Sequence, residues 1–65
     1  MKTGIVKFYN SEKGYGFIIN DEDKKDIFVH AKELNCDIEK DMRVSFNIEE
    51  GKRGLNAKNV NELHG

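Results

Sequence analysis

Hydrophobic and polar residues alternate with a period of two along several short stretches of this chain. The clearest case is Arg43–Glu49, where the alternation directs Val44, Phe46 and Ile48 to one side. Similar runs, rich in β-branched and aromatic residues, occur at 3–9, at 15–19, at 26–30 and near 56–63. The pattern therefore predicts five short strands.

The segments between these stretches have the composition of turns. Asn10–Gly14 is a turn cluster in which Gly14 can supply a positive φ at no steric cost. The segment 21–26 mixes charges of both signs, which indicates a solvated turn, and 50–54 contains two glycines. The segment 31–36 is long enough for at most one helical turn. We therefore predict an all-β fold, a single domain over 1–65 built as a small five-stranded antiparallel barrel.

Alternation in two of these stretches separates aliphatic from aromatic side chains. Ile18, Ile27 and Val29 share the side that we expect to face the barrel interior. The opposite side carries three aromatic rings and a histidine, namely Tyr15, Phe17, Phe28 and His30. Exposed aromatic patches usually mark a binding surface, so we expect one here. The alternative is that the rings form the core and the aliphatic side chains face outward.

The charge balance restricts where a nucleic acid could bind. The chain has 65 residues, with 11 Lys and Arg against 12 Asp and Glu, and a net charge of −1. The whole molecule therefore exerts no electrostatic pull on nucleic acid, and such a function needs a local cationic patch. Lys7 and Lys13 lie close in sequence to the aromatic residues, and Lys52, Arg53 and Lys58 could add charge. Rings flanked by cations suit single-stranded nucleic acid, because every base offers a face for stacking.

Several other classes of protein are disfavoured. No apolar run exceeds three residues, whereas a membrane span needs roughly 20, and the N-terminus lacks the apolar stretch of a signal peptide. Cys36 is the only cysteine, so we expect no internal disulfide and a reducing, cytoplasmic setting. His30 has only Cys36 and His64 as companions, at no ligand spacing that indicates a metal. Without a nucleophile–base pair, we expect neither an enzyme nor a cofactor.

Four motifs in a fixed order carry a resemblance to a known family. Lys13–Ile18 resembles the first ribonucleoprotein motif and Ile27–His30 the second, and they are flanked by characteristic stretches at 4–10 and 50–60. Together they are similar to the bacterial cold-shock proteins. The resemblance implies an OB-type barrel that binds single-stranded RNA and DNA and acts as an RNA chaperone without using ATP. An RNA recognition motif domain is disfavoured, because it carries these two motifs in the opposite order and needs two helices.

The resemblance also implies which residues bind. By position they are Lys7, Phe8, Lys13, Tyr15, Phe17, Phe28, His30 and Arg53. Phe8 has the same parity as Val6, which the pattern assigns to the core, so the first strand must coil or bulge if both assignments hold. We expect a monomer with no membrane or metal partner. The alternative function is a small β-barrel that binds protein segments on its aromatic face.

The chain departs from the family pattern at four places. Phe8 stands where Trp is common, Ala31 where Phe is common, and Leu55 where Pro is usual. The segment between His30 and Val44 is shorter than in many members and contains no aromatic residue. Two stacking platforms are thereby missing, the ring replaced by Ala31 and the aromatic residue of the segment between His30 and Val44. At about 1–3 kcal/mol each, their loss would lower the affinity for nucleic acid by roughly one to four decades. Tyr9 either compensates in part or packs at the barrel end; the sequence leaves both readings open.

Overall fold

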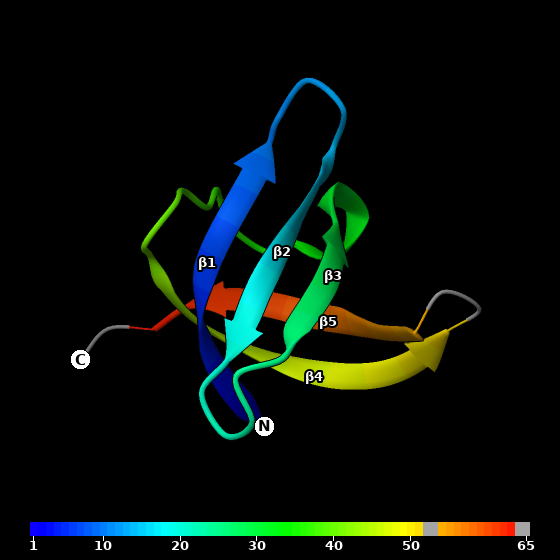
Figure 1. Ribbon diagram of the computed structural model, residues 1–65. Helices are drawn as coiled ribbons and strands as arrows, with labels where there is room; N and C mark the ends of the chain where they lie inside the picture. The colour runs from blue at the N-terminus through cyan, green and yellow to red at the C-terminus, as the bar shows by residue number, and fades with distance from the viewer. Residues whose placement is uncertain (52–53, 64–65) are drawn as a thin grey trace.

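The computed structural model describes residues 1–51 and 54–63, and it contains the five predicted strands (Figure 1). They are β1 (Lys2–Asn10), β2 (Tyr15–Asn20), β3 (Asp26–His30), β4 (Arg43–Gly51) and β5 (Gly54–Glu62). Their ends lie within two residues of the predicted bounds. A 3₁₀ turn, η1 (Ala31–Glu33), follows β3, which confirms the single helical turn. Within the described ranges, no helix is long and apolar enough to cross a membrane.

The strands close into a barrel in the order β1-β2-β3-β5-β4. The pairs β1–β2, β2–β3, β1–β4 and β4–β5 are antiparallel, as predicted, but β3 and β5 run parallel. The predicted five-stranded barrel is therefore confirmed as mostly antiparallel, with one parallel pair that the prediction did not include. The reason is topological, because a closed ring with an odd number of strands cannot reverse direction at every pair. The parallel seam is short, pairing only Phe28 with Asn56 and Val29 with Ala57.

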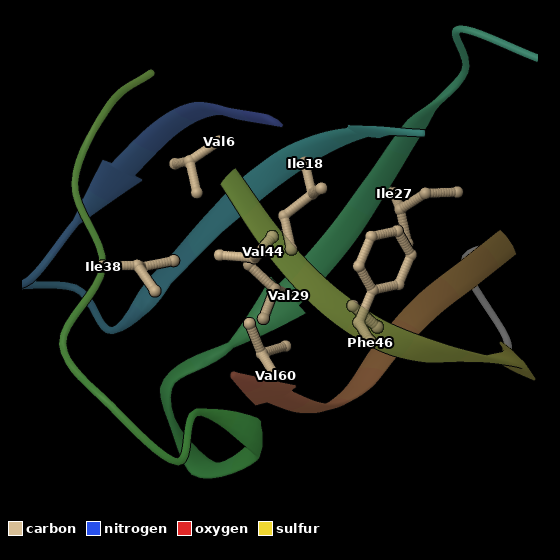
Figure 2. Close-up of a cluster of buried hydrophobic side chains, with 9 residues drawn as sticks. Val6, Ile18, Ile27, Val29, Ile38, Val44, Phe46 and Val60 are labelled. Atoms are coloured by element: carbon tan, nitrogen blue, oxygen red, sulfur yellow. The ribbon is translucent and has the colours of Figure 1, made fainter. Parts of the chain in front are cut away.

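Aliphatic side chains from all five strands fill the barrel interior (Figure 2). The buried hydrophobic residues are Val6, Ile18, Ile27, Val29, Ile38, Val44, Phe46, Ala57 and Val60. This confirms the inward assignment of the aliphatic side chains, and the alternative in which the aromatic rings of β2 and β3 form the core is wrong. Ile38 was not predicted; it comes from the segment between η1 and β4 and points into the core from one side (Figure 2).

An irregularity in β1 directs Val6 into the barrel and Phe8 to the outer face. The register of β1 against β2 shifts between Val6 and Phe8, so that Val6 is fully buried while Phe8 is 42% exposed. The bulge expected from the equal parity of these residues is thereby confirmed. Gly16 permits the close approach of the two strands, because a Cβ there would collide with the Phe8 carbonyl oxygen and the Tyr9 Cα.

The turn between β1 and β2 is fixed to the far end of β3. Gly14 adopts a φ of +73°, as its place in the predicted turn suggested. Its carbonyl oxygen accepts a hydrogen bond from the Ala31 N–H at 2.9 Å. Tyr9 is partly buried against the core. Of the two roles that the sequence left open for it, stacking or packing, this is the packing role. The turn therefore holds Lys13 close to the end of β3.

A carboxylate closes the other end of the barrel. Asp21 accepts hydrogen bonds from the Thr3 hydroxyl and from the Arg43 guanidinium, both at 2.8 Å. Thr3 is on β1 and Arg43 is on β4, and these two strands are paired with each other, so Asp21 links both of them. The Thr3 hydrogen bond, opposed by partial desolvation and supported by Arg43, lowers the pKa of Asp21.

Asp21 should make folding stability depend on acid pH. Because its pKa is lower in the folded chain, its contribution is complete above the unfolded value of about 3.9 and is lost as the pH falls through the folded value. We expect Asp21→Asn to be less stable than the parent at neutral pH. The difference should shrink below about pH 4. Urea unfolding at several pH values measures it, with the exposed Asp37→Asn as control; a pH-independent difference would contradict the assignment.

Candidate nucleic-acid interface

Four aromatic rings lie together on the outer face of β1, β2 and β3. Cross-strand pairing brings them there, since Phe8 lies opposite Phe17, and Phe17 opposite Phe28. Tyr15 lies opposite His30, which extends the row to the end of β3. We call this surface the aromatic face; its members are Phe8, Tyr15, Phe17, Phe28 and His30. Figure 1 shows the three strands that carry it side by side.

The rings contact one another as a continuous layer. Tyr15 and Phe28 lie nearly parallel, with their centroids 6.0 Å apart and an angle of 16° between their planes. Phe17 meets Phe28 edge to face at 5.7 Å, and Phe8 lies 5.9 Å from Tyr15. Such geometries are favourable for aromatic pairs. Each ring therefore contacts at least one neighbour, so that the four rings form one continuous layer.

The aromatic face borders an open hollow of about 500 Å³. Its walls are Lys13, Tyr15, Phe17, Phe28 and His30, all of them predicted binding residues. Among the described residues, the Lys13 side chain is exposed and has no ion-pair partner. The hollow therefore combines flat apolar walls with one unpaired cation at its edge.

Lys7 stands beside the aromatic face but is paired. Its ammonium group lies 3.1 Å from the Asp26 carboxylate at the start of β3. Both side chains are about half exposed, at 54% and 48%, and a pair so open to water contributes little free energy. The predicted role of Lys7 stays a prediction, and sequence reasoning missed Asp26, which comes from a strand that is not adjacent to β1.

His30 has a defined hydrogen bond. Its Nδ1 accepts from the backbone N–H of Lys32 at 3.2 Å, where it caps η1. In the neutral ring the proton is therefore on Nε2, which leaves that nitrogen as a donor. The side chain is exposed at the edge of the hollow. It can offer both a ring face and a hydrogen-bond donor to a ligand.

A second hollow of about 290 Å³ adjoins the first across Phe28 and His30. Its other walls are Lys32, Glu33, Asn56, Ala57 and Lys58. Glu33 and Lys58 form an ion pair at 3.0 Å, and the hydrogen bond from Lys58 to Glu33 raises the pKa of the lysine. Sequence reasoning had considered Lys58 as a source of charge but missed Glu33 and Asn56. Only the parallel register of β3 with β5 shows that Asn56 lies beside Phe28.

The remaining predictions concern residues away from these hollows. Arg53 and Lys52 lie outside the described residues. Ala31 is half-buried beside Tyr9 and Leu34 and lines neither hollow. In the part of the chain that the structure describes, no group of three or more His, Cys, Asp or Glu side chains could hold a metal ion.

Comparison with known proteins agrees with this architecture. Residues 2–63 match the family described as the "cold-shock" DNA-binding domain. The chain belongs to the cold-shock domain family. It is 48% identical to the major cold shock protein CspA of Bacillus cereus over 65 residues, covering 94% of this chain and 96% of the relative. It is 44% identical to the cold shock-like protein CspG of Shewanella violacea over 62 residues, covering 89% of each.

A solved structure supports the fold independently. The chain superposes on "drosophila Unr CSD456" with a TM-score of 0.81 and 21% sequence identity. The match covers 97% of this chain and 26% of that longer one. Family membership implies that this cold-shock domain binds nucleic acid and is not an enzyme.

The positions of the rings predict how they affect stability. Phe46 is 1% exposed, so Phe46→Ala should cost about 3–5 kcal/mol of unfolding free energy or abolish folding. Phe17 is only partly buried on the outer face, so Phe17→Ala should cost clearly less, about 1–2 kcal/mol. Urea unfolding, monitored by circular dichroism, gives the free energy of unfolding of each variant for this comparison. Equal losses would mean that the outer rings support the fold as much as the core does.

Proposed function

We propose that this cold-shock domain binds single-stranded RNA and DNA by stacking bases on the aromatic face. The observation that carries the proposal is the hollow in which Tyr15, Phe17, Phe28 and His30 meet Lys13, which has no ion-pair partner among the described residues. Base–aromatic stacking is worth about 1–3 kcal/mol per base, and a neighbouring cation can hold the phosphate. Lys7, Phe8 and Arg53 are proposed to extend this site, by position in the family pattern.

The geometry favours single strands over duplexes. In a duplex each base is stacked on its neighbours, so its faces are not available to a protein ring. The aromatic face lies on the outer side of β1, β2 and β3, which lie side by side in the barrel (Figure 1). Binding by stacking would favour unpaired strands and disfavour RNA base pairing. We therefore propose an RNA chaperone or a regulator of transcription or translation, acting without a cofactor.

Fluorescence anisotropy with labelled oligonucleotides tests this function. We expect binding to single-stranded U-rich and T-rich oligomers and none to a duplex of equal length. Phe28→Ala should weaken binding about 5- to 150-fold, since one stacking ring is lost. If the protein contacts two to four phosphates, a plot of the logarithm of the binding constant against the logarithm of the salt concentration should have a slope of about −1.5 to −3. The label must be on the nucleic acid because the chain has no Trp.

Folding must be controlled in the same experiment. Asn61→Ala serves as a matched substitution, because Asn61 is exposed on β5 and lines neither hollow. If no oligomer binds more tightly than high micromolar, base stacking is not the function. The aromatic face would then be tested for protein segments, with ribonuclease treatment distinguishing direct capture from capture through RNA.

The missing aromatic at position 31 gives a gain-of-function test. The family commonly has Phe at this position, directly after His30, whereas the Ala31 side chain lies beside Tyr9 and Leu34 and lines neither hollow. The family pattern, more than the geometry around Ala31, therefore motivates this test. We expect Ala31→Phe to raise oligonucleotide affinity by at least about 5-fold through one added stacking platform. Asn61→Phe, which adds the same ring elsewhere, is the control. An equal gain in both variants would mean that added apolar surface alone is responsible.

A further inference from the structure

The second hollow differs in chemistry from the first. The first hollow is lined by rings with one cation. The second is lined by Phe28 and His30 together with the polar side chains of Glu33, Asn56 and Lys58, and the exposed Lys32 lies at its wall as well. The two hollows share Phe28 and His30, so a strand that stacks on these rings would place a base edge at the Glu33–Lys58 pair. The second hollow thus offers polar groups at the edge of a stacking surface.

The backbone holds this polar group in place. Asn56 is paired with Phe28 across the parallel seam, and Lys58 follows two residues further on the same side of β5. Glu33 ends η1, which is tied to β5 by the hydrogen bond from Asn35 N–H to the Val60 carbonyl at 2.8 Å. The carboxylate and the ammonium group are therefore positioned before any ligand arrives. Their side chains are 28% and 33% exposed, so water screens them less than an open surface pair.

At the Glu33–Lys58 pair itself, the carboxylate disfavours phosphate, so that a phosphate would be attracted to the neighbouring Lys32 instead. Glu33 neutralises Lys58 at 3.0 Å, and its remaining lone pairs repel an anion. What the pair presents is two acceptor oxygens beside one donor nitrogen. The Watson–Crick edge of guanine carries the complement, two adjacent N–H donors and one carbonyl acceptor. Uracil and thymine offer one N–H between two carbonyls, so one carbonyl would face a carboxylate oxygen. Cytosine and adenine each offer only one donor group, their exocyclic amine.

We propose that the Glu33–Lys58 pair is a base-reading subsite that selects guanine at the nucleotide stacked on Phe28 and His30. Glu33 accepts from the N1–H and the N2–H of the base, and Lys58 donates to O6. Asn56, whose side-chain amide carries two N–H donors and one carbonyl acceptor, lies at the same wall. The inference rests on the proposed single-strand binding and deepens it. It makes this domain selective at one position instead of uniformly pyrimidine-preferring.

A guanine walk tests the subsite. Oligo(dT) of fixed length carries a single dG at each position in turn, and a single guanine avoids self-association. We expect one register to bind more tightly than oligo(dT) by about 5- to 150-fold, the range of one good bidentate contact. Replacing that dG by deoxyinosine, which lacks the N2 amine, should remove most of the gain. Replacing it by 7-deazaguanine, which keeps the Watson–Crick edge, should not.

Protein variants locate the reading group. Glu33→Gln replaces one acceptor by a donor, so the ratio of dG to dT affinity should fall toward one. Glu22→Gln is the matched control, because it breaks the exposed Lys2–Glu22 pair at 2.7 Å on another surface and should leave the ratio unchanged. The inosine comparison uses the parent protein and does not depend on whether Glu33→Gln folds.

Each outcome has a distinct meaning. If oligo(dT) binds but no dG position gains affinity, the guanine subsite is wrong and the single-strand function stands. If a gain persists with inosine or in folded Glu33→Gln, another group reads the base and the assignment is overturned. If no oligomer binds at all, the proposed function fails and the subsite fails with it.

Discussion

The small interior of the closed barrel is the constraint on which the rest of this structure depends. Of the six aromatic residues in the chain, only Phe46 is buried, and the remaining core volume is taken by valine, isoleucine and one alanine. Three rings on β2 and β3 have no room inside, so they lie outside and pack against one another. The aromatic face is thus a consequence of how little the barrel can hold, combined with alternation along each strand.

The bulge in β1 shows how closely the fold and the site are linked. Without the register shift between Val6 and Phe8, one of the two would be on the wrong side of the sheet. Gly16 on the facing strand leaves the space in which the shifted backbone fits. The Val6 carbonyl and N–H beside the shift pair with Asp41 and Met42, from the segment that also supplies Ile38 to the core. The bulge in β1 therefore contributes at once to the pairing with the segment before β4, to the core through Val6 and to the aromatic face through Phe8.

Local charge pairing, more than net charge, shapes the electrostatics of this face. The net charge is −1, yet Lys13 is unpaired among the described residues beside the rings. Lys7 and Lys58 are each accompanied by a carboxylate, Asp26 and Glu33. Pairing of this kind weakens a general attraction for phosphates and adds acceptor groups that a base edge can meet.

The sequence by itself determined the strands, their inner and outer sides, the bulge and most of the aromatic face, because period-two alternation and turn composition are local properties. Its motifs also sufficed to identify the family. Only the tertiary structure decided that β3 and β5 run parallel, that Ile38 completes the core, and that Asp26 and Glu33 pair with lysines distant in sequence. These features depend on closure of the barrel, which brings together residues whose spacing along the chain carries no periodic signal.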